Sequence, residues 1–248
     1  MTAVWMLPLL LWAPVANAPG ALPPREILRY NVEWRLVTAG KARLQWAAAP
    51  HHSAAGWQAD LHLESAGLVS KLYKVNNDYV SNLGSDLCAA GSYLTAAEGN
   101  RHKETRITFN REAHKAEYLE KDLDKNTVVN AHEIDIPPCV HDVLGGLYLL
   151  RTLNLQPGQT TQVAVSDGKK SVMARVEAQQ REEVKTPAGS FKTIRYEAFL
   201  FNGVLYRRYG SLHVWLTDDA RKLPVQIRVR LQFAIGTITL QLEKEEKT

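Results

Sequence analysis

The sequence predicts a single mainly β domain, built as a large curved antiparallel sheet or open barrel that wraps one central helix, with one further short helix. Many segments alternate apolar and polar residues, and Gly, Pro, Asn or Asp residues separate these segments. One segment, residues 139–151, is instead apolar at helical spacing over most of its circumference. Hydrophobic residues make up 45% of the 248 residues, which is enough for a sizeable core.

The first strands form a predicted hairpin. Residues 27–37 alternate so that Tyr30 and Trp34 share one side, and Thr38 to Gly40 supply a turn before the return strand 41–48. Further strands are predicted at residues 57–64, 79–83, 93–98, 103–109, 115–119 and 127–136.

A short helix is predicted from Leu68 to Tyr73, because the apolar residues there fall at helical spacing. Ser65 lies just before this segment and is a candidate N-cap, since a serine hydroxyl accepts a hydrogen bond from the first free N–H groups of a helix. This helix would connect two neighbouring strands of the sheet.

The central helix is predicted over Cys139–Arg151. A helix with so wide an apolar surface is buried on several sides, so a sheet that wraps round it would supply its neighbours. Gly145 and Gly146 lower the helix propensity, and close approach of another element is the expected reason. Asp142 is expected to cap the start of the helix, where the helix dipole favours a negative charge.

Strands follow one another after this helix, with turn residues between them. The predicted strands are residues 160–165, 171–178, 181–185, 191–199, 205–209, 212–216, 223–231 and 236–242. Because strands lie on both sides of one helix and no linker is evident, we predict a single domain over residues 19–248.

The N-terminus resembles a secretory signal peptide over residues 1–18. The apolar run of residues 5–12 is too short to span a bilayer, and the small residues Ala16-Asn17-Ala18 supply a cleavage site. We therefore expect export, to the periplasm or beyond. No later segment of the sequence is long and apolar enough for a transmembrane helix, so none is expected in the mature chain.

Two cysteines, Cys88 and Cys139, leave three alternatives open. In an exported protein they would form a disulfide, which would close a long loop and contribute roughly 4 kcal/mol to stability. They could instead be two buried thiols. The third alternative makes Cys139 a nucleophile assisted by His141, two residues further on.

Charge and histidine patterns argue against two classes of partner. The formal net charge is +4, and the basic residues are scattered instead of forming the concentrated patch typical of nucleic-acid binding. Eight histidines are present, but none has zinc-ligand spacing; His51 and His52 are adjacent in a predicted loop. We expect no nucleic-acid partner, no metal and no cofactor.

The stretch Gly210–Arg230 predicts a long hairpin near the end of the chain. Asp218 and Asp219 form its turn and could be a binding turn or a carboxylate pair for acid–base chemistry. Adjacent strand residues point to opposite faces, so the two carboxylates would not converge, and a solvated turn is expected. Trp215 either packs in the core or stacks on a ligand. Five residues are the candidate lining of an apolar ligand site beneath this hairpin: Trp34, Tyr73, Leu147, Tyr148 and Trp215.

Several motifs occur in an order that resembles a known family. They are Tyr30-Asn-Val-Glu-Trp34, the helix with His141-Asp142 and Leu147-Tyr148, Asp167-Gly168, Thr186–Phe191, and Val214-Trp215 with Pro224-Val225. Together they resemble the bacterial exported family of domain of unknown function 3108. This resemblance implies an envelope location and a mainly β fold, and it implies no activity or catalytic residue. The layout is also similar to the open barrels of periplasmic lipoprotein carriers.

Three functions follow as hypotheses. The first is a non-enzymatic envelope protein whose curved sheet holds a lipid or another apolar or amphipathic envelope molecule. The second is a structural or assembly factor that binds an envelope protein through its surface and edge strands. The third is an envelope hydrolase with a site near Cys139, His141 and Asp142.

Overall fold

The computed structural model describes residues 22–35, 37–49, 56–232 and 236–246; the predicted signal segment 1–18, with His51 and His52, lies outside these ranges. The described residues form one fourteen-stranded antiparallel sheet and two helices. The strands are β1 (Arg25–Trp34), β2 (Val37–Ala48), β3 (Trp57–Ser65), β4 (Val75–Leu83), β5 (Ala89–Glu98), β6 (Arg101–Asn110), β7 (Lys115–Asp122), β8 (Thr127–Asp135), β9 (Thr160–Ser166), β10 (Ser171–Thr186), β11 (Gly189–Ala198), β12 (Gly210–Thr217), β13 (Pro224–Leu231) and β14 (Gly236–Glu246). The helices are α1 (Gly67–Leu72) and α2 (Val143–Thr152).

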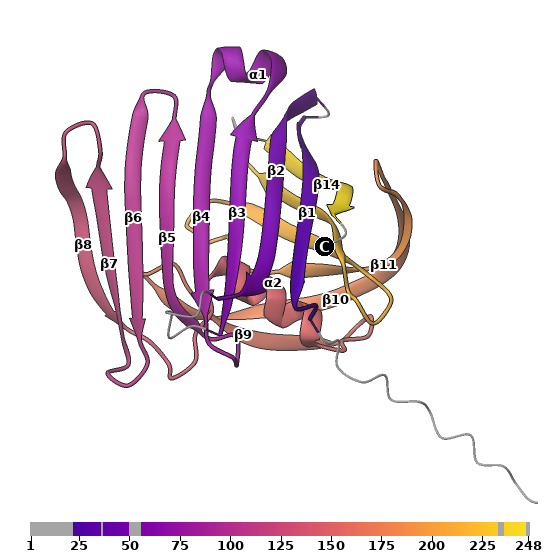
Figure 1. Cartoon of the computed structure of the whole chain (residues 1–248). Coiled ribbons are helices and arrows are strands. Elements are labelled where there is room, and N and C mark those ends of the chain that lie inside the picture. Colours follow the sequence, from indigo (N-terminus) through magenta and orange to yellow (C-terminus); the bar gives the residue numbers. More distant parts are fainter. Residues whose placement is uncertain (1–21, 36, 50–55, 233–235, 247–248) are drawn as a thin grey trace, which may run out of the picture.

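The sheet is continuous but open. Its strand order is β8-β7-β6-β5-β4-β3-β2-β1-β14-β13-β12-β11-β10-β9, so β8 and β9 are the two edges. Figure 1 shows β1–β8 as one broad half, while β9–β14 cross behind it at a steep angle. Helix α2 lies between the two halves and packs against β4 and β9. The predicted fold class is therefore confirmed.

Alternation along β1 sets the two sides of the sheet. Leu28, Tyr30 and Val32 are buried on the side that packs against α2, which we call the inner face. Arg29 and Asn31 point to the opposite side, the outer face. The pairing of Leu28 with Leu44 of β2 continues the apolar inner surface into the next strand.

Helix α2 begins at Val143, later than the Cys139 start that the sequence predicts. The residues before it are extended, and His141 forms a short parallel bridge with β9, in which its N–H donates to Ala164 O at 2.9 Å. Asp142 is the N-cap, as predicted, and its side chain accepts a hydrogen bond from the Gly145 N–H. A Cβ at Gly145 would lie 2.9 Å from Leu83, whereas Gly146 has open space, so close approach explains only the first glycine.

Two predictions in the first half of the sheet are wrong: the N-cap of α1 and the turn of the first hairpin. Ser65 is not its N-cap; Ala66 occupies that position without a side-chain hydrogen bond, and Ser65 Oγ instead accepts from the Val75 N–H at 2.9 Å. The first hairpin turns at Arg35, which has φ 50°, and residues 38–40 already belong to β2. Gly40 is required there because a Cβ would overlap the Glu64 carbonyl of β3.

Two further differences concern the second half of the sheet. The strands predicted at 171–178 and 181–185 form one strand, β10, since a bulge between Ala178 and Gln180 absorbs the break in alternation. Residues 205–209, predicted as a strand, form bends and irregular backbone after a turn at 201–204. Leu205 there is buried in the core, which explains the apolar character that suggested a strand.

The inner face is closed by aromatic packing on α2. Tyr148 is fully buried and stacks on Trp46 of β2 with ring centroids 4.1 Å apart, and Trp46 stacks on Trp57 of β3 at 4.9 Å. Stacked aromatic pairs add to the free energy gained from apolar burial alone. In the described ranges, neither helix is long and apolar enough to cross a membrane.

Candidate functional site

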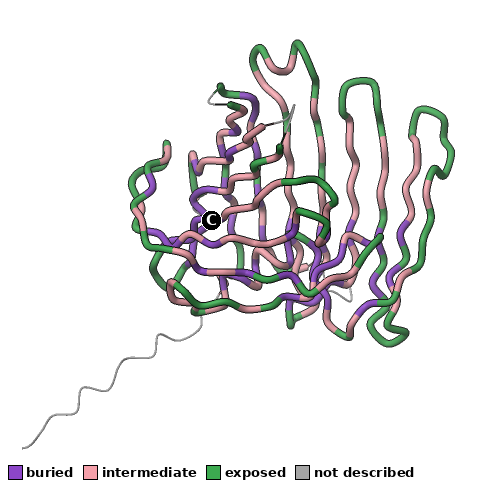
Figure 2. The backbone as a smooth tube through the Cα atoms, turned by 180° about the vertical axis from the view of Figure 1, so that it is seen from behind, coloured by how far each residue is buried: buried purple, intermediate pink, exposed green. Residues whose placement is uncertain are grey.

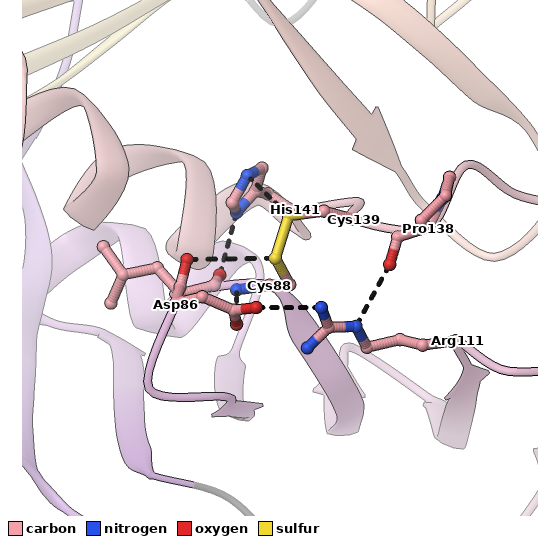
Figure 3. The surroundings of a disulfide bond; sticks show 7 residues. Asp86, Cys88, Arg111, Pro138, Cys139 and His141 are labelled. Carbon is pink, nitrogen blue, oxygen red and sulfur yellow. Dashed lines mark hydrogen bonds and ion pairs between the residues drawn. A yellow bond between two sulfur atoms is a disulfide. The ribbon is translucent and has the colours of Figure 1, made fainter.

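The two cysteines are joined in a disulfide, with their Cα atoms 5.2 Å apart (Figure 3). This result excludes a thiolate nucleophile at Cys139 in the oxidised protein. The bond ties the turn after β4 to the extended segment that precedes α2. Arg111 reinforces the same junction, because its guanidinium pairs with Asp86 at 2.8 Å and donates to the Pro138 carbonyl at 3.0 Å.

His141 and Asp142 are used by the fold and do not face each other as a catalytic pair. The His141 ring is buried, and its Nδ1 lies 2.8 Å from the Leu87 carbonyl oxygen; burial lowers the pKa of the ring. Asp142 accepts hydrogen bonds from the Gly145 N–H at 2.7 Å and the Tyr79 hydroxyl at 2.9 Å. Burial raises the pKa of the Asp142 carboxyl. The geometry therefore gives no support to a hydrolase centred on these residues.

The five predicted ligand-site residues do not gather round one cavity. Leu147 and Tyr148 lie on α2 within the packed interior. Tyr73 is half-exposed at the end of α1, next to Gly99. Trp34 ends β1, with the Arg35 guanidinium 5.3 Å from its ring centroid. Trp215 alone lines a large surface hollow, and it does so on the outer face.

This hollow, which we call the outer groove, has a volume of about 1090 Å³. Its floor comes from the outer faces of β12, β13 and β14, because Trp215 pairs with Gln226 and Gln226 pairs with Gln241 in adjacent strands. The lining residues are Glu33, Arg35, Arg195, Ser211, His213, Trp215, Arg228, Arg230, Leu231, Gln232, Gly236, Thr237, Thr239 and Gln241.

The β10–β11 hairpin borders the outer groove, to which it contributes Arg195. The far part of this hairpin bends back toward β13 and β14, as the curved strands in Figure 1 show, and the Ala188 N–H donates to Leu242 O at 3.0 Å. Val184 packs in the same cluster as Trp215, and the Trp215 Nε1–H donates to Glu182 at 2.8 Å. Trp215 is thus held in one orientation and packs in the core, with only 3% of its surface exposed at the groove.

The outer groove carries an excess of positive charge. Four arginines line it, at positions 35, 195, 228 and 230, against one carboxylate, Glu33. The Arg195 guanidinium lies 3.5 Å from the carboxylate of Glu182, a residue that does not line the groove. Within the described ranges, no carboxylate lies within 4.0 Å of Arg228 or Arg230. The Arg228 guanidinium instead lies 5.0 Å from the Trp215 ring centroid, a cation–π contact.

His213 also lines the outer groove. Its Nε2 is 3.6 Å from Glu197, and its position in β12 pairs directly with Arg228 of β13. Burial lowers the pKa of the ring, and the nearby Arg195 and Arg228 lower it further, whereas Glu197 opposes them. A neutral His213 near pH 7 can donate and accept hydrogen bonds without adding charge to the groove.

Sequence reasoning identified Trp215 as a stacking candidate but missed the arginines around it. The signal was the alternation Gln226-Ile-Arg228-Val-Arg230, which places the polar side chains on one face of a strand. In the described part of the chain, no group of three or more His, Cys, Asp or Glu side chains is arranged to hold a metal ion. The groove is therefore a site of arginine and aromatic chemistry.

The chain matches the family model of a protein of unknown function, DUF3108, over residues 29–243. The chain belongs to this family. The DUF3108 match includes every residue that lines the groove and all of α2. No curated protein matches the chain.

One solved structure shares the overall fold of this DUF3108 chain. A β-barrel-like protein of domain of unknown function DUF1849 from Brucella abortus matches with TM-score 0.55 and 8% identity, and the match covers 91% of this chain and 98% of that one. A DUF1089 family protein from Pseudomonas aeruginosa matches with TM-score 0.40 and 13% identity over 77% of this chain and 90% of that one. The first match supports a barrel-like fold and carries no information on activity.

Proposed function

We propose that this DUF3108 protein is a non-enzymatic envelope protein that binds an anionic amphipathic molecule in the outer groove. The observation that carries the proposal is the pair Arg228 and Arg230, whose charges have no carboxylate partner among the described residues. An arginine offers a planar fork of donors that matches a phosphate or carboxylate group. A bound anion would balance both charges at once.

The rest of the groove suits the apolar part of such a ligand. The Trp215 ring and the Leu231 side chain lie in the lining, together with the threonines at positions 237 and 239. The inner face was the site expected from the sequence, but Tyr148 and its aromatic neighbours pack it against α2. The outer groove is the better location, since it is open and already lined by the donors that an anion requires.

The disulfide supports the proposed compartment. Disulfides persist in oxidising compartments such as the bacterial periplasm and are rare in the cytosol. The Cys88–Cys139 bond is thus consistent with export, and an envelope contains many anionic amphiphiles. Periplasmic location remains part of the proposal, with the signal segment outside the described residues.

Titration with small amphiphiles below their micelle concentration tests the proposal. Octyl phosphate should bind, and octyl glucoside, which has the same chain without the charge, should bind at least about tenfold more weakly, since tenfold corresponds to only about 1.4 kcal/mol. The double variant Arg228→Gln/Arg230→Gln should lose at least about tenfold in affinity for octyl phosphate.

The matched control for this titration is Arg25→Gln/Arg101→Gln. It removes two exposed arginines that lie away from the groove, so it changes the net charge by the same amount and should leave binding unchanged. No binding of octyl phosphate by the wild type, or equal effects of the two double variants, would overturn the proposal.

An assembly role is the second candidate, and the β8 edge favours it. β8 ends the sheet with one side unpaired, and both Val128 and Val129 are exposed on it. An exposed edge strand can accept a strand from another chain. If it does, Val128→Lys/Val129→Lys should abolish a partner that co-purifies with the wild type; retention of that partner by the variant would contradict this role.

A further inference from the structure

Helix α1 presents apolar side chains to solvent at one end of the sheet. Leu68 and Leu72 are 73% and 83% exposed, the highest values among the large apolar residues that are described, and no residue of α1 is buried. Their spacing of four places both on one side of the helix. Figure 1 shows α1 as a protrusion beyond the ends of β3 and β4, and Figure 2 shows this tip as exposed.

The protrusion is anchored at its base, so the leucines are held outward. The Ala66 N–H donates to the Ala39 carbonyl of β2 at 2.8 Å, and Ser65 Oγ accepts from the Val75 N–H. On the far side, the Tyr73 ring lies against Gly99, where a Cβ would come within 3.0 Å of it. These contacts fix both ends of α1 to the sheet and leave Leu68 and Leu72 without an intramolecular site to fill.

Basic residues flank the exposed leucines. Lys71 and Lys74 are exposed, and no carboxylate lies within 4.0 Å of either in the described part of the chain. Residues 66–75 contain no Asp or Glu. Val37, at the start of β2, the strand that α1 contacts, is another exposed apolar side chain. Apolar residues that enter the acyl boundary and cations that meet anionic headgroups are the two features of interfacial membrane binding.

We propose that this end of the molecule, the α1 tip, docks on an anionic lipid bilayer, with Leu68 and Leu72 inserted and Lys71 and Lys74 against the headgroups. This site is separate from the outer groove and goes beyond the function proposed for it. A partner protein is a poorer fit, because a stable protein interface buries roughly 800 Å² on each partner. A narrow protrusion with a few apolar side chains offers much less, but a bilayer accepts such a tip.

The α1 tip and the outer groove lie at the same end of the strands. Arg35, which lines the groove, follows β1 directly, and its N–H donates to the Thr237 carbonyl at 3.1 Å. The next strand, β2, carries Val37 and contacts α1. A bilayer held by the α1 tip would thus lie near the Arg35 end of the groove, where an amphiphile could pass between membrane and protein.

Sedimentation with vesicles tests the docking. The wild type should bind vesicles of phosphatidylglycerol and phosphatidylethanolamine, and it should bind vesicles of phosphatidylcholine alone at least about tenfold more weakly. Leu68→Ser/Leu72→Ser should reduce partition to the anionic vesicles by about tenfold or more. The control Met173→Ser, which changes an exposed apolar residue on β10, should bind as the wild type does.

Charge is tested by a second matched pair. Lys71→Glu/Lys74→Glu should weaken vesicle binding by about tenfold or more, whereas Lys185→Glu/Lys192→Glu, with the same net charge, should bind as the wild type does. All substituted residues are exposed or half-exposed. Circular dichroism spectra and melting temperatures equal to those of the wild type would show that the variants are folded. Absence of wild-type binding to the anionic vesicles, or equal binding by the α1 variants, overturns the proposal.

Two further measurements separate membrane docking from ligand binding in the outer groove and from self-association. Octyl phosphate titration should give wild-type affinity for the α1 variants, and Arg228→Gln/Arg230→Gln should still bind vesicles, so each site fails or succeeds independently. Sedimentation velocity should show no self-association. If the wild type instead forms dimers that Leu68→Ser/Leu72→Ser dissociates, and does not bind vesicles, the tip is a contact between copies and the bilayer proposal is wrong.

Discussion

Arg151, near the end of α2, forms a two-point ion pair with Glu26 of β1, with N–O distances of 2.6 and 2.9 Å. The side chains are only 1% and 6% exposed. Arg151 Nε also donates to the Lys222 carbonyl at 3.1 Å, in the turn between β12 and β13. One guanidinium thus joins the central helix to both halves of the sheet.

Loss of Glu26 should destabilise the fold strongly. Glu26→Ala would leave the Arg151 charge buried without its partner, which costs about 3–5 kcal/mol of unfolding free energy. Urea denaturation followed by circular dichroism measures the change. The control Glu183→Ala removes an exposed carboxylate from β10 and should cost less than about 0.5 kcal/mol. Equal midpoints for the two variants would contradict a structural role for the pair.

Removal of the disulfide should lower stability by roughly 4 kcal/mol, because the bond closes a loop with a sequence separation of 51. Cys88→Ser/Cys139→Ser should therefore unfold at lower urea concentration than the oxidised wild type. Addition of a reductant should shift the wild type toward the variant and leave the variant unchanged. Identical curves for oxidised wild type and variant would show that the bond is absent in solution.

The strands could be predicted well where the alternation of apolar and polar residues is regular. The prediction failed where a glycine allows two strands to approach closely instead of forming a turn. Gly40 suggested a turn, but it lies inside β2 because the Glu64 carbonyl of β3 approaches too closely for a Cβ. The actual turn includes Arg35, which has positive φ without being glycine. Such a turn has no local sequence signal, since tertiary pairing imposes it.

The start of α2 and the outer groove depend on contacts that are distant in sequence. The segment before Val143 is extended because β9 binds the His141 backbone. The groove arises because register places His213 opposite Arg228 and Arg195 opposite Trp215. Alternation predicts which face each residue occupies, but only the register shows which charges meet.

Stability should depend on pH through Asp142. Burial raises the pKa of this carboxyl in the folded state, so its contribution is fully present below the unfolded pKa and is lost as pH rises through the folded pKa. Asp142→Asn keeps an oxygen for the Gly145 N–H and removes the titration. The variant should therefore gain stability relative to the wild type as pH rises from about 4. Melting temperatures measured from pH 4 to 8 would show this; a constant difference would contradict it.

Trp215 should serve both the fold and the ligand, and two substitutions separate the roles. Trp215→Phe keeps an aromatic ring beside Arg228 but removes the Nε1–H that donates to Glu182, so it should cost about 1.5–3 kcal/mol of stability. Octyl phosphate affinity should fall by less than about threefold, because the cation–π contact and the apolar surface persist. Trp215→Leu should cost similar stability and also weaken octyl phosphate binding by at least about threefold. Calorimetric titration and urea denaturation of both variants decide the point: equal ligand affinities would show that the ring serves packing alone.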